Sequence, residues 1–253
     1  MTRIIDLNAD MGEGFGPWNM GDDAGLMRVI SSANIACGFH AGDPDVMART
    51  MDLALAADVA LGAHPGFADL QGFGRRQVTL SESELTNLIQ YQLGAAMALA
   101  QARGAKIAHF KLHGALSNMA SHSQDIARTC FQAALKIAPD IRLIVLPQTA
   151  MEMAARDLHA NWSGEIFADR TYCDDGTLTD RSAPNAVIHD PQIAAARIIT
   201  MIEKRAIISA SGKEIPAQID TVCVHGDSPA ALQMATELRR ALETFGLKIA
   251  AQK

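Results

Sequence analysis

The sequence carries no excess of positive charge. Its 22 lysines and arginines are outnumbered by 28 aspartates and glutamates, which leaves a formal net charge of -6. A chain with this balance has no basic field that would attract phosphate backbones or anionic lipid. We therefore expect neither nucleic acid nor a membrane as a partner.

Long apolar runs and paired cysteines are also missing. No 18 apolar residues follow one another, and residues 1–8 lack the apolar stretch of a signal peptide. Four cysteines are scattered through the chain without a C-x-x-C pair, which is typical of reduced thiols. These absences predict a cytoplasmic protein whose cysteines mostly serve packing.

The sequence contains no standard nucleotide-binding loop. Gly12, Gly14 and Gly16 are spaced G-x-G-x-G instead of G-x-G-x-x-G, and G-x-x-x-x-G-K-[ST] does not occur. The three glycines would still let the backbone approach a ligand closely.

Short apolar runs alternate with segments of helical period along the whole chain. Seven runs are strand candidates, and most are near-continuously apolar, as expected of parallel strands covered on both faces. They span residues 3–7, 33–37, 59–63, 107–111, 142–146, 162–167 and 221–224. Capping residues introduce helices at Ser81 with Glu84 and at the Asp-Pro or Ser-Pro pairs 43–44, 190–191 and 228–229.

No linker or composition shift divides the chain, so we predict a single domain over residues 1–253. Seven strand-helix units fit a closed or nearly closed α/β barrel of the TIM-barrel type. Alternation alone also permits a doubly wound open sheet. The barrel is favoured because polar residues follow nearly every predicted strand, whereas an open sheet concentrates them at one switch point.

The fourth predicted strand ends in a lysine and a histidine. Lys111 and His113 are two residues apart, so both side chains point to the same side of an extended strand. Burying a lysine beside a histidine at a barrel mouth is costly without a purpose. We predict that the lysine holds an anionic group and that the histidine moves a proton.

Acids, imidazoles and arginines follow the other predicted strands. With Lys111 and His113, the catalytic candidates are Asp10 and Glu165. Substrate contacts are predicted for Asn8, Glu13, His40, His64, Arg75, Asp169, Arg170, His225 and Asp227. Many of these residues also have a structural interpretation as a turn residue, a helix cap or a surface ion pair. His109 and His122 receive no role, and Asp43 is better explained as a helix cap.

Several long motifs occur along the chain. They are SANIACGFHAGDP (32–44), GAHP (62–65), GFGRR (72–76), FADR (167–170), VIHD (187–190) and VCVHGD (222–227). Together they resemble the LamB/YcsF family over a stretch from Asp6 to about Leu242. Two positions depart from the family pattern: its usual KPHGALYN reads KLHGALSN at residues 111–118, and its usual cysteine after the first Asn is Ala9.

The resemblance implies a distorted seven-stranded (β/α) barrel of the glycoside hydrolase/deacetylase type. It also implies hydrolytic opening of 5-oxoproline to L-glutamate with ATP and Mg²⁺, by the A subunit of a 5-oxoprolinase that acts with partner subunits B and C. ATP would phosphorylate the amide oxygen, and an imidazole or carboxylate would then guide water to the carbon.

Two alternatives stay open. A metal-dependent hydrolase or deacetylase of the same barrel type would use a divalent metal, for which Asp10, His40, His64 and His225 offer ligands. A non-catalytic subunit would only bind 5-oxoproline. A homo-oligomer is compatible with each of these functions.

Overall fold

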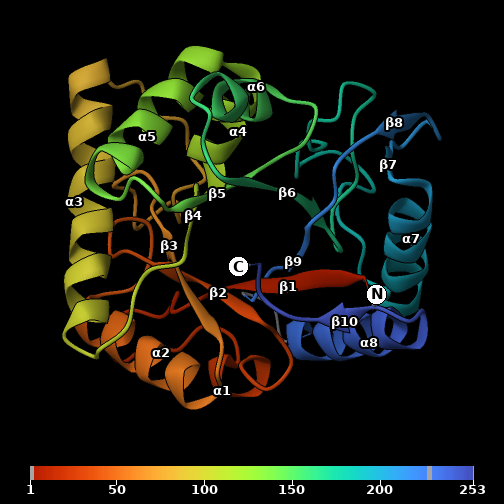
Figure 1. Cartoon of the computed structure of the whole chain (residues 1–253), viewed down its shortest axis with the longest axis horizontal. Helices are drawn as coiled ribbons and strands as arrows, with labels where there is room; N and C mark the ends of the chain where they lie inside the picture. The colour runs from red at the N-terminus through yellow and green to blue at the C-terminus, as the bar shows by residue number, and fades with distance from the viewer. Residues whose placement is uncertain (1–2, 227–229, 253) are drawn as a thin grey trace.

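The computed structural model describes residues 3–226 and 230–252. In these ranges, seven parallel strands form a ring with the helices outside it (Figure 1). They are β1 (Ile4–Met11), β2 (Ser32–Ala36), β3 (Ala60–His64), β4 (His109–Lys111), β5 (Arg142–Val145), β6 (Trp162–Phe167) and β9 (Thr221–Val224). Strand β9 pairs with both β6 and β1, and Thr221 lies opposite Glu165 on one side and Asp6 on the other. The predicted barrel is therefore confirmed, and the open sheet is wrong.

The inside of the barrel is polar, and β1 shows how alternation produces this. Inside the ring, Asp6 contacts Thr221 of the neighbouring β9, whereas Asn8 and Asp10 contact Glu165 of β6 and Lys111 of β4. Leu7 and Ala9 point the other way and belong to the hydrophobic core. The prediction ended this strand at residue 7, where the apolar run stops. The strand continues to Met11 because its polar side chains find partners inside the barrel.

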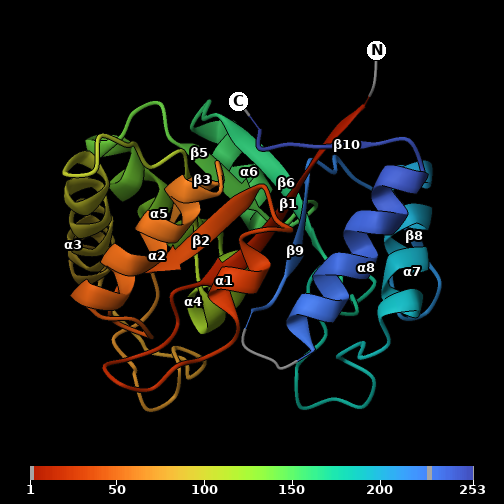
Figure 2. The same ribbon diagram turned by 90° about the horizontal axis from the view of Figure 1, so that it is seen from below.

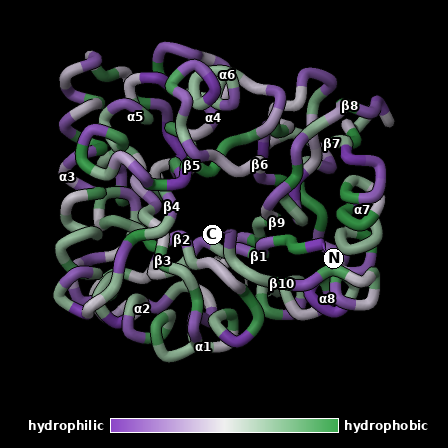
Figure 3. Tube along the Cα trace, viewed as in Figure 1, coloured by the Kyte–Doolittle hydropathy of each residue, from purple (hydrophilic) through white to green (hydrophobic). Residues whose placement is uncertain are grey.

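The helices pack against the outer face of the ring. In the described ranges they are α1 (Asp23–Leu26), α2 (Pro44–Ala56), α3 (Glu82–Gln101), α4 (Gly114–His122), α5 (Gln124–Ile137), α6 (Ala150–Asp157), α7 (Pro191–Lys204) and α8 (Ala231–Thr244). Figure 3 shows hydrophobic and hydrophilic positions alternating along α3 and α5, whose buried residues include Leu93 and Phe131. The main core therefore lies between strands and helices.

Helix starts follow the predicted caps. Ser81 and Glu84 form the capping box that begins α3. Asp43 and Asp190 accept backbone N–H groups at the starts of α2 and α7, so the interpretation of Asp43 as a cap is confirmed. The pair at 228–229 lies outside the described residues.

Three short strands were not predicted. Strands β7 (Ala206–Ile208) and β8 (Glu214–Pro216) form an antiparallel hairpin apart from the ring, and β10 (Lys248–Ile249) pairs with the start of β1 (Figure 2). Segments of two or three residues are too short for a hydrophobic period to show. No helix in the described part of the chain has both the length and the apolar character to cross a bilayer.

Candidate active site

Titratable side chains gather at one rim of the barrel. Asp10, His64 and Lys111 lie at or near the carboxyl ends of β1, β3 and β4, and His225 directly follows β9. The carboxyl ends of parallel strands meet at the same rim, which is where (β/α) barrels place their active sites. These four residues line a cavity of about 630 Å³.

Lys111 lies between two carboxylates. Its Nζ donates to Asp10 Oδ1 at 2.9 Å, and Glu165 Oε1 is 3.0 Å away. The Cys223 sulfur is also 3.0 Å from Nζ. Burial opposes the charge, but Asp10, Cys223 and Glu165 keep the pKa of Lys111 well above its ordinary value. The lysine is therefore a buried ammonium ion.

The two carboxylates respond differently to that ammonium. Burial alone would raise the pKa of Asp10, but the charges of His64 and Lys111 hold it well below its usual range. For Glu165 burial dominates and raises the pKa, although Lys111 offsets part of the effect. Asp10 is thus a stable carboxylate, and Glu165 is the readier of the two to carry a proton.

Two asparagine side chains orient these carboxylates. Asn8 Nδ2 donates to Glu165 Oε1 at 3.0 Å. Asn34 Nδ2 donates to Asp10 Oδ1 at 2.8 Å and to Asn8 Oδ1 at 2.6 Å. The amides therefore connect the two acids across the inside of the barrel.

Sequence reasoning missed Asn34 and gave His109 no role. His109 Nε2 lies 2.7 Å from Asn34 Oδ1, so the imidazole fixes which way the amide faces. Asn34 is paired in register with Asp10, a relation that becomes visible only when β1 and β2 are aligned. For His109 a signal existed, because it shares the alternation of Lys111 and His113.

His64 and His113 contact one another. His113 Nδ1 is 3.1 Å from His64 Nε2. The other nitrogen of each ring faces a backbone carbonyl: His64 Nδ1 is 2.9 Å from the Lys111 oxygen, and His113 Nε2 is 2.9 Å from the Phe73 oxygen. Burial, and then the neighbouring His64, lower the pKa of His113 well below its ordinary value.

Glu13 and His40 complete a buried cluster with this pair. The His40 ring stacks on His113 with centroids 3.7 Å apart, and its Nε2 is 4.0 Å from Glu13 Oε1. Neither ring nitrogen of His40 has a hydrogen-bond partner among the described residues. One ligand atom from each of Glu13, His40, His64 and His113 lies within 4.8 Å of the other three, so the cluster fits a divalent metal ion.

His225 forms a separate pair with Asp169. Its Nδ1 lies 2.9 and 2.8 Å from the two carboxylate oxygens, and its ring stacks on Phe167 at 5.3 Å between centroids. Burial alone would raise the pKa of Asp169, but the charge of His225 lowers it. With Nδ1 held, Nε2 is the nitrogen left to meet a ligand in the cavity that His225 lines.

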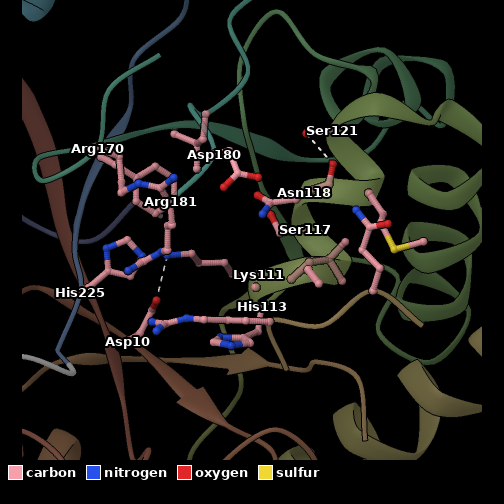
Figure 4. A pocket seen from close by; sticks show the side chains of 18 of the residues that line it. Asp10, Lys111, His113, Ser117, Asn118, Ser121, Arg170, Asp180, Arg181 and His225 are labelled. Carbon is pink, nitrogen blue, oxygen red and sulfur yellow. Dashed lines mark hydrogen bonds and ion pairs between the residues drawn. The ribbon is translucent and has the colours of Figure 1, made fainter. Parts of the chain in front are cut away.

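The outer part of the cavity has two polar walls. Arg170 and Arg181 come from the segment after β6, and Ser117 and Asn118 come from α4 opposite them (Figure 4). Arg170 is built into its segment, because its guanidinium donates to two backbone carbonyl oxygens there. His122, which received no role from the sequence, also lines the cavity.

The adjacent Arg75 and Arg76 face different partners. Arg76 forms an ion pair with Asp69. Arg75 lines the cavity, and its guanidinium carbon lies 4.8 Å from the centroid of the Phe73 ring. Only Arg75 is therefore part of the candidate site.

Most of the predicted site residues come together. Those that line the cavity are Asp10, Glu13, His64, Arg75, Lys111, His113, Arg170 and His225. The others contact them from outside the lining: Asn8 and Glu165 contact Lys111, His40 contacts His113, and Asp169 contacts His225. Asp227 lies outside the described residues.

The predicted set of metal ligands is only partly reproduced. His40 and His64 belong to the buried cluster. Asp10 Oδ1 contacts Lys111 and its Oδ2 lies 3.4 Å from His64 Nε2, so Asp10 borders the cluster without being one of its four ligands. His225 faces Asp169, and Glu13 and His113 contribute the other ligand atoms. Spacing along the sequence could not separate these choices, because the partners of each group come from other strands.

Comparison with known proteins identifies the family. The profile of the LamB/YcsF family matches residues 5–253. The chain belongs to this family. A protein of Ruegeria pomeroyi, named as the A subunit of 5-oxoprolinase, is 57% identical over 251 residues, which cover 99% of each chain. The resemblance inferred from the motifs is thereby confirmed.

Solved structures support the same barrel. The lactam utilization protein of Thermus thermophilus superposes with a TM-score of 0.92 and 40% identity, over 98% of this chain and 100% of that one. The catalytic domain of a peptidoglycan N-acetylglucosamine deacetylase from Eubacterium rectale gives a TM-score of 0.54 at 9% identity, over 100% of this chain and 90% of that one. The second likeness concerns the fold alone.

Proposed function

We propose that this LamB/YcsF chain hydrolyses 5-oxoproline to L-glutamate as the A subunit of an ATP-dependent 5-oxoprolinase, together with partner subunits B and C. The observation that carries the proposal is the buried Lys111 ammonium between Asp10 and Glu165 at the cavity. The names of two relatives, a 5-oxoprolinase A subunit and a lactam utilization protein, supply the substrate class.

The reaction needs an activated carbonyl. Amide resonance makes a five-membered lactam a poor electrophile. ATP, with Mg²⁺, supplies the activation by phosphorylating the amide oxygen. Because the sequence holds no standard nucleotide loop, we assign the ATP site to an interface with one of the partner subunits.

The residues around Lys111 then act on the ring. Lys111, a donor already oriented in a buried site, stabilises the negative charge of the phosphoryl group on the former carbonyl oxygen. Water adds to the carbon, the ring C–N bond breaks, and hydrolysis of the resulting acyl phosphate releases phosphate and L-glutamate. Glu165, whose pKa burial raises, lies behind the cavity lining and positions Lys111 through its 3.0 Å contact with Nζ. His225 takes a proton from the attacking water through Nε2, because Asp169 holds Nδ1, and returns it to the ring nitrogen as the C–N bond breaks.

The remaining side chains position the substrate or these groups. Arg75 and Arg181 offer guanidinium groups to the carboxylate of 5-oxoproline. His113 was predicted to move a proton. We now assign it to holding His64, because both of its ring nitrogens face other groups.

The test is the release of L-glutamate from 5-oxoproline by the purified chain, with and without subunits B and C and with and without ATP. We expect release only when all components are present. A Lys111→Met chain in the full mixture should release none, whereas Lys106→Met, at an exposed position, should match the wild type. Release by the chain alone without ATP would contradict the proposal.

A metal-dependent hydrolase is the second candidate function, and the Glu13, His40, His64 and His113 cluster favours it. Such an enzyme would hydrolyse an amide after metal loading, without ATP or partners. The same glutamate assay, run on the chain alone with added divalent metal, separates the two.

A further inference from the structure

The hydrogen positions on His64 and His113 follow from their backbone contacts. A carbonyl oxygen only accepts, so His64 Nδ1 carries a hydrogen toward the Lys111 oxygen and His113 Nε2 carries one toward the Phe73 oxygen. In neutral rings, the other two nitrogens then hold lone pairs and no hydrogen. These nitrogens, His64 Nε2 and His113 Nδ1, face each other at 3.1 Å. Two facing lone pairs need a positive group between them, which is either a metal ion or a proton on His64 Nε2, an atom that also lies 3.4 Å from Asp10 Oδ2.

Two more potential metal ligands, Glu13 and His40, lie beside these two nitrogens. Glu13 Oε1 is 3.9 Å from His113 Nδ1 and 4.0 Å from His40 Nε2. Donors that share an ion at about 2.1 Å lie at most about 4.2 Å apart. The separations of 3.1, 3.9 and 4.0 Å fall inside that limit. All four ligand atoms lie within 4.8 Å of one another, so the most widely separated of them would draw together on binding. His40 is completely buried, and neither of its ring nitrogens is hydrogen-bonded within the described residues.

We propose that Glu13, His40, His64 and His113 bind one divalent transition-metal ion of the zinc or cobalt type. Three imidazoles and one carboxylate suit Zn²⁺ or Co²⁺, whereas Mg²⁺ and Ca²⁺ prefer ligand sets made of oxygen. This site stands independently of the proposed lactam reaction, because it rests on the ligands and not on the substrate.

The surroundings are those of a built metal site. Ligating histidines usually donate their second ring N–H to a carbonyl or carboxylate, as His64 and His113 do here. Gly66 and Gly74 give the rings their room: a Cβ at Gly66 would lie 2.8 Å from His40 Nδ1, and one at Gly74 would lie 2.6 Å from the His40 Cβ. The backbone thus encloses the imidazoles as closely as sterics allow.

The ion would be accessible from the cavity. Glu13, His64 and His113 line the cavity that also holds Lys111 and His225. Glu13 and His40 also line a second hollow of about 320 Å³. Both hollows therefore border the cluster.

The experiment is a Co²⁺ titration of the full chain after removal of metal with a chelator, followed by visible absorption and by metal analysis after dialysis. We expect one equivalent of bound Co²⁺ with ligand-field bands typical of nitrogen and oxygen coordination. Glu13→Gln and His113→Gln should each weaken binding more than about 100-fold, beyond the loss caused by an outer partner. His225→Gln and His122→Gln are the matched controls and should bind like the wild type.

A second readout guards against misfolded variants. Bound metal should raise the thermal unfolding temperature of the wild type and of both controls. The metal-free Glu13→Gln chain should unfold near the metal-free wild type but gain nothing from Co²⁺. The proposal is overturned if the wild type binds no stoichiometric metal, which would leave a shared proton between His64 and His113. It is also overturned if binding survives both ligand changes or is lost in His225→Gln.

Discussion

Two neighbouring regions of the cavity differ in how completely their polar groups are satisfied. Around Lys111, the ammonium contacts Asp10, Glu165 and the Cys223 sulfur, and asparagine amides orient the carboxylates. In the histidine cluster, the two nitrogens of His40 have no hydrogen-bond partner among the described residues. Buried polar groups are almost always satisfied in native proteins. The first region is therefore complete without a ligand, whereas the second is built to receive one.

The largest expected effect comes from removing the Lys111 ammonium, whose neighbours satisfy its hydrogen bonds. Lys111→Met leaves the buried Asp10 and Glu165 without their cation, so we expect a loss of about 3–5 kcal/mol in the free energy of unfolding. Urea denaturation at neutral pH measures this loss. Lys106→Met changes an exposed lysine in the segment that leads into β4 and should stay within about 0.5 kcal/mol. Equal losses in both variants would show that the Lys111 region is not a stabilising unit.

The pair of His225 and Asp169 tests whether proton transfer lies outside the histidine cluster. Asp169→Asn should lower kcat by about 10² to 10⁴ with little change in KM, because it frees the orientation and tautomer of His225. Steady-state glutamate release across pH measures the effect. A variant that raised KM and left kcat unchanged would assign Asp169 to substrate binding instead.

Glycine substitutions compare the packing of the histidine cluster with that of an open turn. Gly74 has φ of +61° and Gly104 has φ of +69°, so alanine is strained at both, by about 1–2 kcal/mol. A Cβ at Gly74 would also meet His40 and His113, whereas nothing lies within 4 Å of one at Gly104. Gly74→Ala should therefore destabilise the fold more than Gly104→Ala in thermal and urea unfolding. Equal losses would mean that the imidazoles have room to move.

The smallest expected effect is a change in how the free energy of unfolding depends on pH in Glu165→Gln. The folded pKa of Glu165 is raised by burial despite Lys111 nearby, so the folded chain holds this proton at pH values where the unfolded chain has lost it. The contribution of this proton to the free energy of unfolding is fully present below the unfolded pKa. It is lost as the pH rises through the folded pKa, by at most about 1.4 kcal/mol per pH unit. In Glu165→Gln this decline should be absent. Urea unfolding of both chains from pH 4 to 8 compares the slopes, and parallel curves would contradict a raised pKa.

Much of the barrel could be predicted from the sequence because most strands are marked by a local apolar run. The run at 162–167 and the run at 221–224 match β6 and β9 in full. Periodicity also placed Lys111 at the rim. What the sequence could not provide was the choice of partner: Asp10 meets Lys111, 101 residues later, whereas Glu13 meets His113. That choice depends on strand register and on distances across the ring, which no local pattern encodes.

Closure of the ring by β9 has a consequence for synthesis of the protein. Six of the seven barrel strands leave the ribosome before residues 221–224 are made. Until then β1 and β6 present unpaired edges, which are templates for wrong association. Asp6, Asn8 and Glu165 likewise lack the neighbouring strand that carries Thr221. The polar side chains of β1 and β6 thus stay in water until β9 is made, and the site forms only as the barrel closes.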